Sequence, residues 1–372
     1  MFQLSDFRLE LLVWLMTVVA VILTVIYWHK LALQKWHHIT ARFTIIIFIQ
    51  ILALTATGIT INRSGEFYAS WGDLFGSNNH LAKVAIASQA LSTISSADIA
   101  RARLTPGGSL IFREVITGAA SNISDVVYVV LSPKIAARLL ANPDRPSIGK
   151  DYKVIALFPG YPGSPSGWIN SMQGVTTLER IEALNSVMPT ILIIPTINVL
   201  PGVDTECMNF AGGAQVETWL TNDVRTFASK FLGLDTRPWN SFGYSTGGWC
   251  AAMLAIRHPD IYRMAVSIAG YFEPDVSASH TKRERNFLAK EYNLIALLTK
   301  HSAKPKLMII TSVKDKFSYE STKYFIKNAG SLIGIRYVPI PQGGHNTKVW
   351  IPYVATGYLW IDPPRGHNSI GP

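Results

Sequence analysis

The stretch SFGYSTGGWC, residues 241–250, decides which fold we expect for the rest of the chain. It places Ser245 two residues from Gly243 on one side and from Gly247 on the other. Glycines at these positions relieve crowding where a strand turns sharply into a helix, so that the serine hydroxyl projects above the sheet. The pattern alone is weak, because it arises by chance and many such glycines only pack a turn. Its meaning therefore depends on the surrounding segments.

The segments on both sides alternate between strand and helix patterns. Short apolar runs predict strands, and runs with helical spacing predict the helices between them. We expect strands at 109–116, 125–133, 153–161, 190–198, 239–245, 264–270, 306–312 and 336–340, and helices at 176–188, 216–231, 246–258, 319–329 and 347–361. The first two strands predict a hairpin. The alternation predicts an α/β fold whose sheet is mainly parallel and carries helices on both faces.

A serine nucleophile needs a histidine base and an acid, which follow it along the chain in the order acid, then histidine. The histidines after Ser245 are His258, His280, His301, His345 and His367. Only His345, in PQGGHNTKVW, lies between the last predicted strand and the last predicted helix, from where an imidazole reaches the top of the sheet. The alternative is a solvated surface histidine.

The acid is expected directly after the strand at 306–312. Asp315 follows that strand by three residues, and Glu320 is the second candidate. The structural alternative is that Asp315 ends a turn and pairs with Lys314 or Lys316, which contributes at most ~1 kcal/mol on a surface.

Two backbone N–H groups are needed to hold the oxyanion of such a reaction. One is expected from Thr246, the residue after the nucleophile, and the other from the loop in LFPGYPGSPSGW, residues 157–168. We assign the second donor to Tyr161. The alternative for this loop is a purely structural turn.

The chain has two cysteines, Cys207 and Cys250. They cannot form a metal site by themselves, and none is expected. A disulfide between them and two separate buried thiols both fit the sequence, since an oxidising exterior would permit the bridge.

Two long apolar runs precede these motifs, at residues 11–28 and 43–62, and each is long enough to cross a bilayer core of ~30 Å. The loop between them carries Lys30, Lys35 and Arg42 and no acid. Cationic loops stay on the cytoplasmic side, so everything after residue 62 is expected outside. A buried helical hairpin and a cleaved signal peptide are the alternatives, and both fit the runs less well.

The formal net charge is +10, of which the first 62 residues supply +2. A basic outer part suits anionic headgroups or cell-wall polymers, whereas nucleic-acid binding is not expected because the densest charge cluster mixes both signs. We expect a membrane anchor at 1–62, a stalk and packing helix at 63–107, a catalytic domain at 108–361 and a flexible tail at 362–372.

Several segments resemble the esterase branch of the α/β hydrolases that includes esterase D (S-formylglutathione hydrolase) and the mycolyltransferases. They are LFPGYPGS, VETWLTNDV, GYSTGGWCAAMLA, SIAGYF and GGHNTKVW. The resemblance covers about residues 108–361 and implies an α/β-hydrolase fold, a triad of Ser245, Asp315 and His345, an acyl-enzyme and no cofactor. VETWLTNDV is most similar to mycolyltransferases, which differ in having Met-Ser at Thr246-Gly247 and Glu at Asp315.

These patterns together predict a membrane-anchored serine esterase or acyltransferase that faces outward and acts on esters, with envelope lipids and mycolyl-type esters among the candidate substrates. Two alternatives remain open. One is a non-catalytic hydrolase-like domain that binds or scaffolds envelope components. The other is an intracellular ester or thioester hydrolase, which the predicted anchor opposes.

Overall fold

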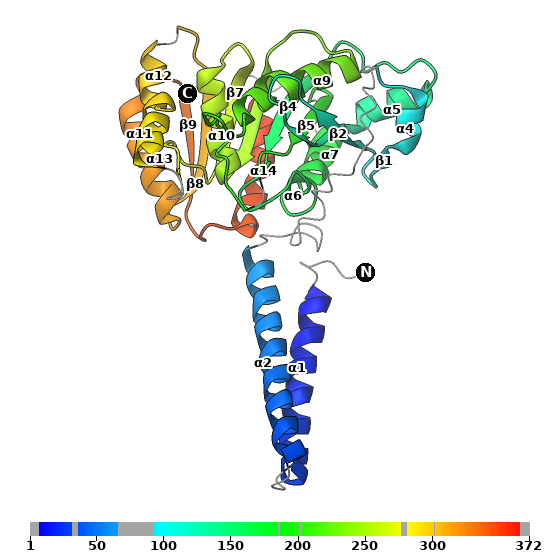
Figure 1. Ribbon diagram of the computed structural model, residues 1–372. Coiled ribbons are helices and arrows are strands. Elements are labelled where there is room, and N and C mark those ends of the chain that lie inside the picture. The colour runs from blue at the N-terminus through cyan, green and yellow to red at the C-terminus, as the bar shows by residue number, and fades with distance from the viewer. Residues whose placement is uncertain are drawn as a thin grey trace. The chain divides into compact units, whose positions relative to one another are not determined.

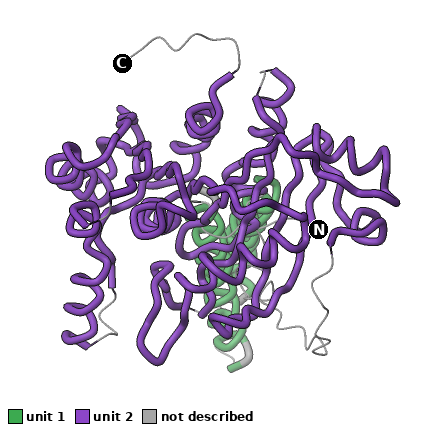
Figure 2. The backbone as a smooth tube through the Cα atoms, turned by 90° about the horizontal axis from the view of Figure 1, so that it is seen from above, with its two compact units in different colours: residues 1–78 green, residues 79–372 purple. Residues whose placement is uncertain are grey.

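The computed structural model describes residues 7–31, 36–65, 93–184, 187–200, 202–276, 281–300 and 302–364. The chain divides into two compact units, Met1–Asn78 and Asn79–Pro372, which Figure 2 shows in separate colours. Much of the predicted stalk lies outside the described residues, as do His280, His301, His367 and most of the predicted tail. Within the stalk region the structure describes one short helix, α4, at Ser96–Arg101.

The first unit is a pair of helices. Helix α1 (Phe7–Tyr27) continues into the short helix η1 (Trp28–Leu31), and helix α2 spans Trp36–Gly65. Thr60 links the pair, because its hydroxyl donates to Glu10 Oε1 at 2.8 Å and accepts from Trp14 Nε1 at 3.1 Å. The stretches Phe7–Lys30 and His38–Asn62 are long and apolar enough to cross a membrane. They contain the two predicted spans.

The second unit is built on a nine-stranded sheet with the order β1-β2-β3-β5-β4-β6-β7-β8-β9 (Figure 1). Strands β1 to β3 pair antiparallel, β3 pairs antiparallel with β5, and the remaining strands are parallel. The strands are β1 Arg103–Leu104, β2 Leu110–Thr117, β3 Ser124–Leu131, β4 Lys153–Phe158, β5 Thr190–Pro195, β6 Trp239–Tyr244, β7 Tyr262–Ile268, β8 Lys306–Ser312 and β9 Ile335–Ile340. The predicted mainly parallel α/β sheet is confirmed.

Helices cover both faces of this sheet and bury two separate apolar cores. The larger core packs α10 (Thr246–Arg257) and its neighbours on one face, where Trp249 and Trp219 are fully buried. The smaller core packs α14 (Thr347–Ile361) and α7 (Gly174–Leu184) on the other. The remaining helices are α5 Pro133–Ala141, α6 Ser166–Ile169, α8 Val216–Thr218, the π-helical turn η3 Trp219–Asp223, α9 Val224–Leu232, α11 Lys282–Glu291, α12 Leu294–Lys300 and α13 Lys316–Ala329.

Some elements differ from the sequence prediction. The expected helix at 216–231 is continuous, but its middle is the π-helical turn η3. Helix α5 was not expected, although Ser132 followed by Pro133 is typical of a helix start. Between β7 and β8 the chain also forms the two helices α11 and α12.

Candidate active site

Ser245 occupies the turn between β6 and α10 with φ of 55° and ψ of −126°. Its N–H donates to the Ile268 carbonyl of β7 at 2.9 Å, which holds the turn to the sheet. At Gly243 and Gly247 there is no room for any side chain, so both positions require glycine. A Cβ on Gly243 would lie 1.8 Å from the Gly247 carbonyl oxygen, and a Cβ on Gly247 would lie 2.0 Å from the Phe158 carbonyl oxygen. The turn is therefore the strand-to-helix bend that the sequence predicted.

The structure brings the three predicted triad residues together. Ser245 Oγ lies 2.8 Å from His345 Nε2, and His345 Nδ1 lies 2.5 Å from Asp315 Oδ2. The serine and histidine are 100 residues apart in sequence, and the histidine and aspartate 30. This arrangement lets a histidine accept the serine proton on one nitrogen while a carboxylate fixes the proton on the other.

Asp315 lies between β8 and α13, and its side chain is only 5% exposed. Burial opposes ionisation of this carboxyl group. The hydrogen bond and charge of His345, together with hydrogen bonds from Ser318, outweigh burial and hold the pKa of Asp315 below its ordinary value. Glu320, the second candidate, instead forms a surface ion pair with Lys323 at 2.8 Å.

The loop that carries His345 is held on both sides. The Ser312 hydroxyl at the end of β8 donates to the Gly343 carbonyl oxygen. After the histidine, the Asn346 side chain accepts from the Val349 N–H at 3.2 Å and so caps α14. The Trp350 ring packs edge-on against the imidazole, with the ring centres 4.6 Å apart. These contacts aim His345 at Ser245, while its side chain stays 39% exposed.

The two predicted oxyanion donors belong to two segments next to the nucleophile. Thr246 is the first residue of α10, so its N–H points out of the open end of the helix. Gly160, whose peptide bond continues to Tyr161, packs directly against the nucleophile. A Cβ on Gly160 would lie 3.1 Å from the Cβ of Ser245.

Sequence reasoning missed a cluster of acids behind the nucleophile. Asp204 Oδ2 accepts from the Thr246 hydroxyl at 2.8 Å, and Glu206 Oε1 accepts from the Tyr271 hydroxyl at 2.5 Å. Burial raises the pKa of Asp204. Burial and the nearby Asp204 charge raise the pKa of Glu206 well above its ordinary value. No periodic pattern could reveal these residues, because they lie in a long loop.

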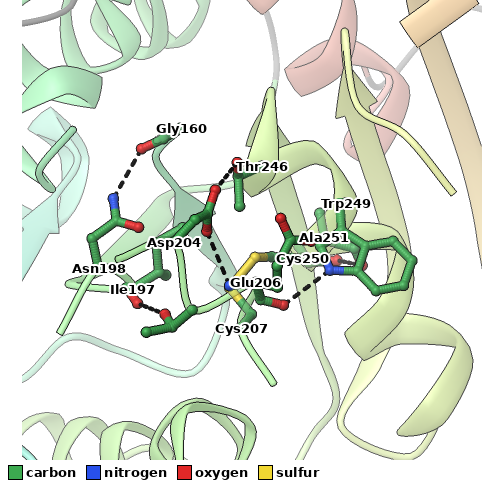
Figure 3. Close-up of a disulfide and its surroundings, with 12 residues drawn as sticks. Gly160, Ile197, Asn198, Asp204, Glu206, Cys207, Thr246, Trp249, Cys250 and Ala251 are labelled. Atoms are coloured by element: carbon green, nitrogen blue, oxygen red, sulfur yellow. Dashed lines mark hydrogen bonds between the residues drawn. A yellow bond between two sulfur atoms is a disulfide. The ribbon is translucent and has the colours of Figure 1, made fainter. Parts of the chain in front are cut away.

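Cys207 and Cys250 form a disulfide whose Cα atoms are 5.7 Å apart (Figure 3). The bridge connects the loop that carries the acids to the helix that begins at Thr246.

His258, the next histidine after the nucleophile, lies at the far end of that helix. Its Nε2 is 2.6 Å from Glu217 Oε1, so it belongs to a different polar network. Among the described residues no cluster of His, Cys, Asp and Glu is arranged to hold a metal ion.

No protein-family model matches the chain. Its sequence is similar to that of an uncharacterized protein of Corynebacterium glutamicum, Cgl0967/cg1104, with 24% identity over 233 residues. The aligned residues are 59% of this chain and 54% of the relative, so the chain matches only about half of that protein's length.

Solved structures share the fold of the second unit. An S-formylglutathione hydrolase of Agrobacterium tumefaciens has a TM-score of 0.54 at 14% identity and covers 70% of this chain and 96% of its own. FphF, a fluorophosphonate-binding serine hydrolase of Staphylococcus aureus, has a TM-score of 0.53 at 16% identity, and the match covers 68% of this chain and 98% of FphF. MPT51 (FbpC1) of Mycobacterium tuberculosis has a TM-score of 0.50 at 13% identity, and the match covers 66% of this chain and 95% of MPT51. The chain has the α/β-hydrolase fold, as the resemblance of its motifs implied.

Proposed function

We propose that the chain is a serine esterase or acyltransferase that works through an acyl-enzyme and is anchored in a membrane. The observation that carries this proposal is the hydrogen-bonded series from Ser245 through His345 to Asp315. The serine adopts a strained turn conformation that only the surrounding glycines allow. Structural neighbours described as an S-formylglutathione hydrolase and a fluorophosphonate-binding serine hydrolase support ester chemistry.

In the first half of the reaction, Ser245 Oγ attacks the carbonyl carbon of the ester while His345 Nε2 takes the serine proton. The carbonyl oxygen becomes an oxyanion, which the N–H groups of Thr246 and Tyr161 receive, a contribution of about 10²–10³ in rate per donor. His345 then gives its proton to the leaving alcohol as the C–O bond breaks. Asp315 holds the imidazole in the required tautomer and stabilises its positive charge.

In the second half, His345 takes a proton from a water or an alcohol, whose oxygen attacks the acyl group on Ser245. The serine oxygen leaves and recovers its proton from His345. The exposure of the His345 side chain supports access for either acceptor, since 39% of it reaches solvent. Esters that include acyl lipids of a cell envelope are the substrate class we infer, with water or a sugar hydroxyl as the acceptor.

We place the anchor at residues 1–62 and the catalytic domain, at 108–361, outside the cytoplasm. Two helices of sufficient length and apolar composition support an anchor. The cationic loop between them supports a cytoplasmic position for that loop, and the basic charge of the remaining chain suits an anionic surface.

Labelling with a fluorophosphonate probe tests the catalytic proposal. We expect the wild-type protein to be labelled, Ser245→Ala to lose all labelling, and Ser229→Ala, on helix α9, to keep it. A series of nitrophenyl esters of increasing acyl length, with and without a sugar acceptor, then separates hydrolysis from transfer. A folded wild-type protein that takes no label and cleaves no ester would instead support a non-catalytic binding domain.

The orientation is tested separately. Two reporters fused after residue 364, one active only outside the cytoplasm and one only inside, should give signal from the first alone. Signal from the second alone would support an intracellular hydrolase.

A further inference from the structure

The loop that leaves strand β5 contacts the two segments that carry the proposed oxyanion donors, Tyr161 and Thr246. We call Asn198, Asp204, Glu206 and Cys207 of this loop the brace, and Figure 3 shows their contacts. The brace contains none of the triad residues and neither oxyanion donor. Its contacts run to the loop after β4 at one end and to the start of α10 at the other.

The side-chain amide of Asn198 holds the peptide unit that carries one donor. Its Nδ2 donates to the carbonyl oxygens of Gly160 at 3.1 Å and Gly163 at 2.8 Å. The Gly160 carbonyl and the Tyr161 N–H belong to one planar peptide bond, so fixing the direction of the oxygen fixes the direction of the N–H. Because Gly160 also packs against Ser245, Asn198 aims the Tyr161 N–H relative to the nucleophile.

Asp204 restrains the residue that carries the other donor. Its Oδ2 accepts from Thr246 Oγ1 at 2.8 Å, and its Oδ1 accepts from the Glu206 N–H at 3.0 Å. The Thr246 side chain is therefore tied to a carboxylate while its N–H faces the open end of α10. A side chain held in one rotamer restricts the backbone angles of the same residue, so Asp204 limits the movement of this donor.

The disulfide fastens the brace to α10. Cys207 pairs with Cys250, one helical turn after Thr246, and Trp249 Nε1 donates to the Glu206 carbonyl at 2.9 Å. Glu206 and Cys207 have φ values of 51° and 54°. L-residues avoid this left-handed conformation, because Cβ crowds the following carbonyl. The main chain of the brace therefore needs these links to stay in place.

We propose that Asn198 and Asp204 are positioning residues for the oxyanion hole, and that the Cys207–Cys250 disulfide holds them there, so that the oxidised protein turns over esters faster than the reduced protein. The proposal rests on the proposed function. Reduction by a dithiol adds two electrons and two protons to the sulfur pair, which becomes two thiols while the dithiol closes to its own disulfide. The freed brace then no longer orients the two donors.

Turnover of an ester by positioning variants is the first test. Asn198→Ala and Asp204→Ala should each lower kcat roughly 10-fold, less than the 10²–10³ for removing a whole donor, with little change in KM. A trifluoromethyl ketone adds to the serine as a tetrahedral oxyanion, and its affinity should fall by the same factor as kcat/KM. A loss of thermal stability alone, with kcat and ketone affinity unchanged, would overturn the positioning role.

Matched controls come from the same unit. Asn240→Ala removes an amide that donates to the Val154 carbonyl, and Asp223→Ala removes a carboxylate that accepts from the N–H groups of Ala120 and Ser121. Neither should alter the ketone affinity. Asp204→Asn keeps an acceptor for the Thr246 hydroxyl and should retain most of the wild-type kcat.

Coupling to Thr246 tests the route by which Asp204 acts. Thr246→Val removes the hydroxyl that Asp204 holds but keeps the N–H donor. If Asp204 works through this hydroxyl, the double variant with Asp204→Ala should be no more than about twofold slower than the poorer single variant. Fully multiplicative losses would contradict the proposal.

A third experiment tests the role of the disulfide by measuring kcat for three samples. They are the oxidised protein, the double variant Cys207→Ala/Cys250→Ala, and reduced wild-type protein that mass spectrometry shows to contain two free thiols. The double variant and the reduced protein should both remain folded and lose about tenfold in kcat, and reoxidation should restore the reduced sample. An unchanged kcat in the folded, reduced protein would overturn the redox proposal. A wild-type protein that cleaves no ester would overturn the proposed function and this inference together, whereas an active wild type with unaffected variants would overturn this inference alone.

Discussion

At Ser245 the main chain adopts a φ of 55°, which a residue with a side chain seldom takes. The surroundings impose this angle. The N–H bond to Ile268 fixes one side of the turn, and the close approach of Gly247 to the Phe158 carbonyl fixes the other. Strain held in this way at a reactive side chain presents its hydroxyl without any rearrangement of the backbone.

Gly247→Ala tests how tightly that turn is built. The added Cβ would lie 2.0 Å from the Phe158 carbonyl oxygen and 2.4 Å from the Pro159 carbonyl oxygen, and backbone atoms in a sheet cannot move aside easily. We expect a loss of about 2–3 kcal/mol in the free energy of unfolding, measured by chemical denaturation. The control is Gly334→Ala, since a Cβ there meets no atom within 4 Å. Equal stability of the two variants would contradict this account.

The variant Asp315→Asn tests whether Asp315 controls the tautomer of His345 or only packs against it. The amide has the shape of the carboxylate but can donate to Nδ1, which favours the wrong imidazole tautomer. We expect kcat for ester hydrolysis to fall by about 10³–10⁴, as in other triads, with an unchanged melting temperature. Glu320→Gln, which breaks only the surface pair with Lys323, should leave kcat unaltered. If Glu320→Gln proved the slower enzyme, the assignment of the acid would be reversed.

Among the elements, the helix that begins with VETWLTNDV is linked to its neighbours by Glu217. This buried carboxylate accepts hydrogen bonds from Arg257 at 2.7 Å and Tyr292 at 2.6 Å and lies 2.6 Å from His258 Nε2. The network joins α8 to the end of α10 and to the end of α11. Burial opposes ionisation of Glu217, but the hydrogen bonds from His258, Arg257 and Tyr292 outweigh it and lower its pKa from 4.5 to about 2.

This lowered pKa predicts a specific acid sensitivity. A carboxyl group whose pKa falls on folding stabilises the native state above its unfolded pKa, and that stability is lost as the pH falls toward the folded pKa. The pKa shift of Glu217 corresponds to a contribution of about 3 kcal/mol to the free energy of unfolding at neutral pH. The stability difference between wild type and Glu217→Gln should therefore be largest near pH 7 and shrink by more than half by pH 3, measured by urea denaturation.

The matched control for Glu217 is Glu291→Gln. Glu291 reaches the same Arg257 at 3.4 Å, but its side chain is 50% exposed. An exposed ion pair contributes at most ~1 kcal/mol, so this variant should be nearly as stable as wild type at every pH. A pH-independent difference between wild type and Glu217→Gln would argue against the network as the source of acid sensitivity.

The last helix of the fold is also fixed by contacts that cross the sequence. Asp362, directly after α14, accepts from the Met188 N–H at 2.5 Å and pairs with Lys153 at 2.7 Å. Lys153 begins β4, so the pair joins the end of the last helix to a central strand. Asp362 therefore contributes to the folded domain.

For the whole molecule, the described residues form two units with different surfaces. In the first, large apolar side chains such as Leu15, Ile22 and Leu54 are exposed. In the second, most of the large apolar side chains of the described residues are buried in two cores, one on each face of the sheet. An exposed apolar surface of that kind is unfavourable in water, and a hydrocarbon layer would cover it.

We therefore expect the full-length protein to stay with membranes through high-salt and alkaline washes and to be released only by detergent. Leu15→Arg together with Ile22→Arg should weaken this retention, because each arginine at a span centre costs about 2.5–3.5 kcal/mol to insert. Fractionation followed by immunoblotting measures both proteins. Full-length wild-type chain in the soluble fraction without detergent would exclude the anchor.

The sequence by itself determined features that depend on neighbouring residues. The spacing of apolar positions predicted the order of strands and helices, and the two glycines around Ser245 predicted the turn, because local sterics decide both. Loop order along the chain pointed to His345 as the base and to Asp315 as the acid, with Glu320 as the second candidate for the acid. The short helix α5 was within reach of the same reasoning, since Ser132 and Pro133 mark its start.

Only the tertiary structure decided which distant loops meet. Asn198 reaches Gly160 and Asp204 reaches Thr246 because parallel strands β4, β5 and β6 lie side by side, and nothing in the composition of that loop marks these partners. The choice between a Cys207–Cys250 bridge and two free thiols was equally open until the loop was placed against α10. Such contacts depend on the register and packing of the whole sheet, which no short stretch of sequence contains.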